Sequence, residues 1–151
     1  MQFSGDLDLA KIPRYSKLEV AKLQLDRAVR LFLDEADYVC AVTPAGAAEE
    51  ILGKLLERQR KKNALGSVVE ACVAYGREVH EEEWAAKDFR DMANQIRNGL
   101  KHYSDGDDID VPRDAAEEMI DRAIENLLSL SLSPSEHVQR FLKWKTECSA
   151  M

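Results

Sequence analysis

The stretch from Ser16 to Ala36, SKLEVAKLQLDRAVRLFLDEA, decides the fold class. Its apolar residues recur every three or four positions, which places them on one face of an α-helix: Leu18, Ala21, Leu25, Ala28, Val29 and Phe32. Ser16 and Glu19 form a capping box, a common start of a helix. The sequence therefore predicts an amphipathic helix over this stretch, followed by a tight turn in which Asp37 caps a second helix.

The same helical pattern continues along the chain. Further helices are predicted at about 38–60, 65–79, 82–100, 112–128 and 133–144, the last with Ser133 and Glu136 as its capping box. Pro44 either kinks the second helix or divides it, and the small residues 45–48 would let another helix approach closely. No period-two pattern of useful length favours a strand. We expect one all-α domain over residues 1–151, an antiparallel bundle of five to six helices with residues 1–15 as an N-terminal extension.

Composition narrows the class of protein. The 151 residues are 45% hydrophobic and 32% charged, which is typical of a globular chain. No run approaches the roughly 18 apolar residues of a membrane span, and the N-terminus has no apolar stretch of a secretory signal. We therefore expect a cytoplasmic protein with no membrane partner. A net charge of −7 and a pI near 5.0 argue against a protein that coats DNA.

Metal and disulfide chemistry is not expected. The three cysteines are an odd number and contain no CxxC, and Cys40 and Cys72 lie in apolar runs that predict buried thiols. The acidic segment from Ser104 to Asp110 fails the EF-hand pattern, because the sixth position counted from Asp105 is Asp110 and not glycine. We interpret that segment as a solvated loop and predict neither a metal nor a cofactor.

The predicted fourth helix carries three stripes at helical spacing. The apolar stripe is expected to face the core: Ala85, Phe89, Met92, Ile96 and Leu100. A second, mostly basic stripe is Lys87, Arg90, Asn94, Arg97 and Lys101. A third, polar stripe is Asp91, Gln95, Asn98 and His102. The last two stripes end together, so a guanidinium, an amide and an imidazole lie within six residues.

This cluster of side chains suits a phosphodiester. His102 can transfer a proton near neutral pH, Arg97 can bind phosphate oxygens, and Asn98 can orient either group. RNA supplies its own 2′-hydroxyl nucleophile, so this chemistry needs no metal. The alternative is an ordinary basic helix C-terminus, in which cations interact favourably with the helix dipole.

At these residues the sequence resembles the HEPN superfamily. That family is marked by an R-x(4–6)-H motif, often with a polar residue directly after the arginine, as in Arg97, Asn98 and His102. Gly99 lies inside the motif and is expected to end the helix early. The stretch LQLDRAVRLFLDEADYVCAVTPAGAAEEILGKLL is also similar to the first helix pair of small bacterial HEPN-like proteins.

The resemblance implies a helical bundle that forms a homodimer. Many HEPN proteins are metal-independent ribonucleases, and others only bind nucleotides or act as scaffolds. The acidic pI and the aspartates after the motif favour a non-catalytic protein that binds a nucleotide or a protein partner. The alternative is a metal-independent endoribonuclease of the toxin or defence type. Its catalytic residues would be Arg97, Asn98 and His102, and its RNA phosphates would be bound by Arg97, Lys101 and Arg90.

The aromatic content also predicts a homodimer. Several aromatic residues are more than a thin bundle readily covers: Phe32, Tyr38, Tyr75, Trp84, Tyr103 and Trp144. A self-complementary helical face is the simplest closed interface for such a surface.

Overall fold

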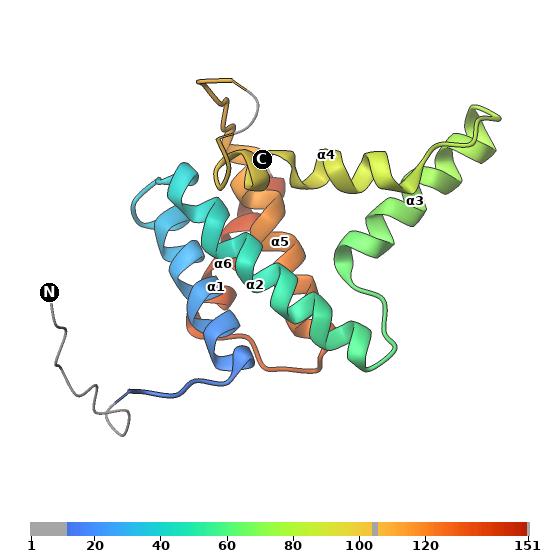
Figure 1. The fold of residues 1–151 in the computed structure, drawn as a ribbon. Helices are drawn as coiled ribbons and strands as arrows, with labels where there is room; N and C mark the ends of the chain where they lie inside the picture. The colour runs from blue at the N-terminus through green and yellow to red at the C-terminus, as the bar shows by residue number, and fades with distance from the viewer. Residues whose placement is uncertain (1–11, 104–105, 151) are drawn as a thin grey trace, which may run out of the picture.

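The protein is all-α, as predicted. The computed structural model describes residues 12–103 and 106–150, and within them it contains six helices and no strand (Figure 1). The helices are α1 (Lys17–Leu33), α2 (Tyr38–Arg58), α3 (Ala64–Val79), α4 (Ala86–Gly99), α5 (Arg113–Ser129) and α6 (Glu136–Ser149). Residues 1–11 of the expected N-terminal extension and residues 104–105 of the expected loop lie outside the described residues.

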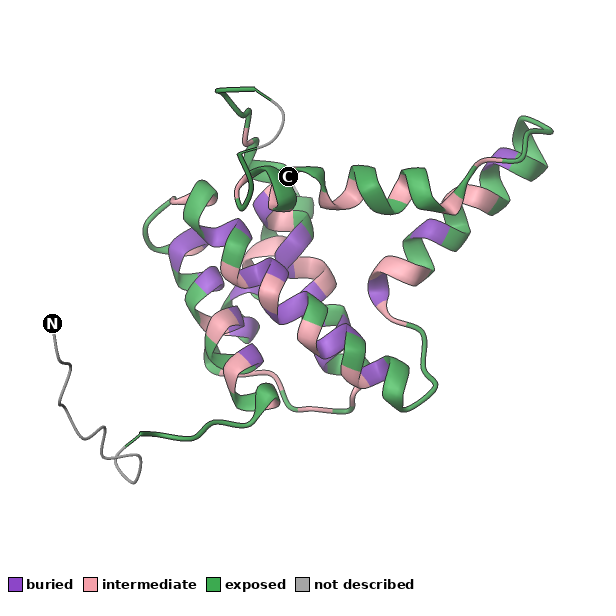
Figure 2. Cartoon of the chain, in the orientation of Figure 1, coloured by how far each residue is buried: buried purple, intermediate pink, exposed green. Residues whose placement is uncertain are grey.

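Four helices form the core. α1 and α2 pack against each other, α5 packs on α2, and α6 packs on α1 (Figures 1 and 2). The largest fully buried apolar side chains come from all four, and they include Leu25, Leu52, Ile120 and Phe141. Each such side chain contributes about 1.5–3 kcal/mol when it leaves water, so this cluster is the main source of stability.

Helices α3 and α4 form an arm, residues 64–99, that stands away from the bundle (Figure 1). Only Ala64, Val69 and Gly76 of α3 are buried, and α4 has no buried residue. The prediction that the apolar stripe of α4 faces the core is therefore wrong for most of its length, and Met92 is 63% exposed. Only Ile96 and Leu100 pack against the core, because α4 reaches the bundle at its C-terminal end.

Local capping sets most helix ends. Both hydrogen bonds of the Ser16–Glu19 box are present, and the Asp37 side chain accepts from the backbone N–H of Cys40. Pro44 lies inside one continuous α2, so it does not divide the helix. The predicted cap of the last helix is wrong: Ser135, not Ser133, accepts from the backbone N–H of Val138.

Two further expectations fail. α4 begins at Ala86 instead of residue 82, since the chain is non-helical between the two and Glu81 has a positive φ of 55°. Cys40 is exposed and Cys72 is half-buried, because Cys40 lies on the outward side of the first turn of α2 and Cys72 lies in the arm. Among the described residues, no helix combines the length and the apolar composition needed to cross a membrane.

Candidate functional site: a basic groove along α2

A buried cluster of charges joins the arm to the bundle. Glu49 of α2 lies between Arg97 of α4 and Arg122 of α5. Arg97 Nη1 is 3.5 Å from Glu49 Oε2, and Arg122 Nε is 3.8 Å from Glu49 Oε1. The Glu49 side chain is only 6% exposed, and the two arginines are 14% and 11% exposed. Three charges from three helices are thus held largely out of water.

Burial dominates the electrostatics of this cluster. It raises the pKa of Glu49, and the opposing effects of Arg122 and Arg97, which lower that pKa, are smaller. Burial likewise lowers the pKa of Arg122, against the favourable charge of Glu49. The ionised form of Glu49 therefore depends on both arginines, and the loss of either leaves a buried charge poorly compensated.

Hydrogen bonds from α5 secure both ends of the arm. Asn126 is fully buried; its Nδ2 donates to the Glu49 carbonyl oxygen and its Oδ1 accepts from the Ala64 N–H at the start of α3. Arg122 Nη2 donates to Asn94 Oδ1 near the end of α4. These contacts place the C-terminal part of α4 beside α2.

A groove follows the exposed face of α2 next to this cluster. Its volume is about 400 Å³, and its lining residues are Lys17, Thr43, Gly46, Ala47, Glu50, Ile51, Lys54, Leu55, Arg58, Arg97 and Lys101. The residues from α2 recur every three or four positions over about four turns, so they make one complete face of the helix. We call this feature the α2 groove.

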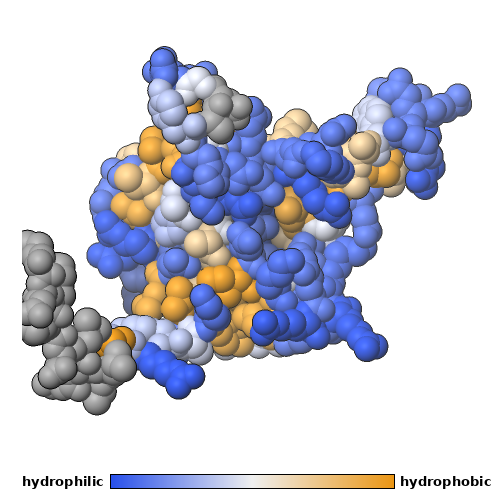
Figure 3. All heavy atoms as spheres, in the orientation of Figure 1, coloured by the Kyte–Doolittle hydropathy of each residue, from blue (hydrophilic) through white to orange (hydrophobic). Residues whose placement is uncertain are grey.

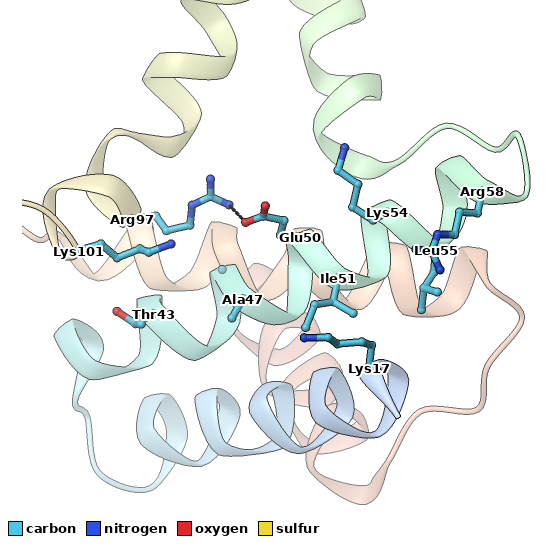
Figure 4. A pocket seen from close by; sticks show the side chains of 11 residues that line it. Lys17, Thr43, Ala47, Glu50, Ile51, Lys54, Leu55, Arg58, Arg97 and Lys101 are labelled. Carbon is cyan, nitrogen blue, oxygen red and sulfur yellow. Dashed lines mark ion pairs between the residues drawn. The ribbon is translucent and has the colours of Figure 1, made fainter. Parts of the chain in front are cut away.

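The α2 groove has an apolar floor and a basic rim. Ala47, Ile51 and Leu55 form the floor (Figure 4), and hydrophobic residues gather on the surface over α1 and α2 (Figure 3). Lys17 reaches the groove from α1, Arg97 reaches it from α4, and Lys101 reaches it from the turn that follows α4 (Figure 4). Its lining contains two arginines, three lysines and one carboxylate, although the whole chain has a net charge of −7. Charge of one sign focused in a cleft attracts ligands of the opposite sign.

The predicted site residues fall on two sides of α4. Arg97 and Lys101 line the α2 groove, whereas Asn98 and His102 line a separate depression, which we call the His102 hollow. The His102 backbone N–H donates to the Asn98 carbonyl oxygen at 3.0 Å, which keeps one more helical turn beyond the end of α4 at Gly99. At about 100° per residue, Arg97 and His102 point roughly 140° apart around the helix.

Three aspartates line the same depression as His102. Among the described residues, the lining of the His102 hollow also includes Asp91, Asp108 and Asp110 and contains no arginine or lysine. Arg90 lies elsewhere, in a recess between α2 and the arm that it shares with Asn94 and Arg97. The structure therefore groups Arg90 with Arg97, Arg97 with Lys101, and Asn98 with His102, but it does not group Arg97 with His102.

Sequence reasoning missed the α2 side of the site. Lys54, Arg58 and Glu49 lie in the predicted second helix, but the sequence did not single them out as site residues. The signal that was present is the run of small residues 45–48, which predicted a close approach. A Cβ added at Gly46 would lie 2.4 Å from Arg97 Cδ, so the Arg97 side chain crosses α2 directly over this glycine.

Comparisons with other proteins add no family assignment. Compared with protein families, characterised proteins and solved structures, the chain matches none. Within residues 12–103 and 106–150, no three His, Cys, Asp or Glu side chains are grouped so that they could hold a metal ion. The groove and the buried charges beside it are the features on which a functional proposal can rest.

Proposed function

We propose that the protein is a non-catalytic, HEPN-like binding protein whose ligand site is the α2 groove. One observation carries this proposal: Arg97 and Lys101 line the groove, whereas Asn98 and His102 line a different hollow. A ligand with anionic groups and an apolar part fits a groove with a basic rim and an apolar floor. Nucleotides and protein segments both belong to this class.

The same geometry gives less support to the endoribonuclease alternative. Cleavage of RNA through this motif needs Arg97 and His102 at one phosphodiester. Arg97 is instead engaged by Glu49 at 3.5 Å and Glu50 at 3.7 Å. The aspartates beside His102 repel a phosphate, so the groove and not the motif is the better binding site.

RNA cleavage is the first test. We expect the wild-type protein to leave a labelled single-stranded RNA intact in EDTA, and His102→Ala to behave identically, since His102 has no proton-transfer role. Gel analysis of the RNA ends checks this. The proposal is wrong if the wild type cleaves RNA to 2′,3′-cyclic phosphate ends and His102→Ala lowers the rate about 10²–10⁴-fold, the usual contribution of a general acid or base.

We also propose that the protein forms a homodimer through the arm. Val68, Tyr75 and Val79 are exposed at a spacing of seven and four residues, so they lie on one face of α3. Met92 of α4 is exposed as well. The arm thus leaves apolar side chains exposed. A second copy of the protein would cover them in a self-complementary interface.

Light scattering tests the dimer. The wild type is expected to show twice the monomer mass of 17.1 kDa at tens of micromolar, and the double variant Val68→Asp/Tyr75→Asp is expected to be monomeric, because it buries two charges in the interface. Leu23→Asp is the matched control, since Leu23 is an exposed apolar residue of α1 outside the arm. A monomeric wild type, or a dimer that survives the arm variant, contradicts the proposal.

A further inference from the structure

We infer that the ligand of the α2 groove is an acidic amphipathic helix of a partner protein. The inference rests on the proposed binding function and adds the class of partner. It follows from the shape of the groove, from the packing of its floor and from the distribution of charge on its rim.

The groove has the dimensions of a helix-binding surface. Its lining runs along α2 from Thr43 to Arg58, which at 1.5 Å per residue is about 22 Å. A second helix of about 15 residues matches this length. At one end the Arg97 side chain covers Gly46, so the open floor there is formed by the small side chain of Ala47. A single nucleotide would cover only part of such a face.

The floor is already held in place for binding. Ile51 and Leu55 are half-buried and pack against the bundle core, so they do not have to be ordered when a ligand arrives. A fixed apolar floor reduces the entropic cost of association. With Ala47 these residues are spaced by four, a ridge against which leucines at three- and four-residue spacing pack.

The rim favours acidic residues along the whole helix. Arg97 and Lys101 lie toward one end of the groove and Arg58 toward the other, with Lys17 on the α1 side (Figure 4). The cations are therefore spread along the floor and do not converge on one phosphate-sized point. Arg97 is paired with Glu49 at 3.5 Å and with Glu50 at 3.7 Å, so these charges largely offset one another. Lys54 pairs with Glu57 at 2.8 Å in an exposed ion pair, which an acidic partner can replace. Lys17, Arg58 and Lys101 therefore carry most of the attraction.

The charge of the rest of the chain adds specificity. With a net charge of −7, the protein repels an acidic partner over most of its surface. The groove is a local exception, so a glutamate-rich helix is attracted to the groove and repelled by the rest of the surface. This combination of attraction at one site and repulsion at others is how interfaces select a partner.

A synthetic peptide tests the inference. The probe is a fluorescein-labelled helix of about 15 residues with leucines at three- and four-residue spacing and glutamates on both sides of that stripe. Its matched control replaces every glutamate by glutamine. Fluorescence anisotropy is expected to show at least about tenfold tighter binding of the glutamate peptide, and a smaller difference in about 0.5 M salt, which screens the rim charges.

Variants of the full chain locate the binding site. Lys54→Glu/Arg58→Glu is expected to weaken peptide binding by about tenfold or more, because two attractive contacts become repulsive. Ile51→Ser is expected to weaken it through the loss of the floor. Lys143→Glu on α6 removes one exposed lysine outside the groove and should leave the affinity unchanged. Circular dichroism verifies that each variant keeps its helices.

The outcomes separate the two proposals. Equal binding of the glutamate and glutamine peptides, or binding that is insensitive to Lys54→Glu/Arg58→Glu, overturns the helix inference. If ATP or an RNA oligonucleotide binds instead and loses affinity in that double variant, the groove remains the ligand site but its partner is not an acidic helix. RNA cleavage that depends on His102 would overturn the binding function itself.

Discussion

Replacing Arg122 by methionine is expected to lower the free energy of unfolding by about 3–5 kcal/mol at neutral pH, the usual cost of removing one partner from a buried ion pair. Arg122 is 11% exposed, and its guanidinium interacts with both Glu49 and Asn94. Methionine fills much of the same volume but leaves the Glu49 carboxylate with Arg97 as its main partner. The loss comes from an uncompensated buried charge and not from a cavity.

The loss should depend on pH, and its sign follows from Glu49. Burial already raises the pKa of Glu49 above its ordinary value of 4.5, and removing Arg122 raises that pKa further. A carboxyl with a raised pKa in the folded state favours folding below its unfolded pKa, and this contribution is lost as the pH rises through the folded pKa. The deficit of Arg122→Met is therefore largest near pH 8 and shrinks toward about pH 4.5.

Urea denaturation across this pH range is the measurement. Glu49→Gln/Arg122→Met should regain most of the lost stability and should show little pH dependence, because the carboxylate left alone is removed with its partner. Arg140→Met is the matched control: Arg140 pairs with Asp34 on the surface, where water and salt screen the charges and the pair contributes little to stability. A pH-independent loss in Arg122→Met, or a loss no greater than that of Arg140→Met, would contradict the account of a buried charge cluster.

Replacing either of two glycines of α2 by alanine should change the stability of the protein, in opposite directions at the two positions. Gly→Ala inside a helix normally stabilises by about 0.5–1 kcal/mol. At Gly53 the added methyl group would have its nearest neighbours at 3.4 Å, an ordinary contact, so Gly53→Ala is expected to stabilise. At Gly46 it would lie 2.4 Å from Arg97 Cδ, and such overpacking costs about 1–3 kcal/mol. Gly46→Ala should therefore destabilise by about 1 kcal/mol.

Parallel urea titrations of the two variants check this difference. Gly46→Ala should also change the environment of Arg97, because its side chain cannot keep its path over α2. Peptide binding in the α2 groove should weaken with it, while Gly53→Ala, which lies outside the groove lining, leaves binding unchanged. If Gly46→Ala stabilised the protein as Gly53→Ala does, Arg97 would not cross α2 at this glycine.

Much of the local structure could be predicted from the sequence. The apolar spacing of residues 16–36 and the caps at Ser16 and Asp37 predicted the first two helices. The separation of α4 into stripes was also correct, since Arg97 and Lys101 face one depression while Asn98 and His102 face another. These features depend on residues three or four positions apart, so the helix itself enforces them.

The hydropathy pattern of α4 did not predict which of its side chains are buried. Its apolar stripe was expected inside, yet Met92 is exposed while the charged Arg97 is largely buried. A hydrophobic pattern predicts which face could be buried, but the arm meets the bundle only at its end. There Glu49 and Arg122 provide partners for a buried cation. Those partners lie 48 positions before Arg97 and 25 positions after it, so no local pattern could indicate them.

The sequence by itself determined the helices, most of their ends and the faces on which the charged residues of α4 lie, because neighbours one turn apart interact in any helix. Only the tertiary structure decided that Lys17, Lys54 and Lys101 share one groove and that Asp108 and Asp110 line the hollow of His102. The physical reason is that three helices, distant along the chain, must pack before their side chains meet. The buried contacts of Glu49 and Asn126 join α2 to α3, α4 and α5, and the apolar core joins α1 to α2.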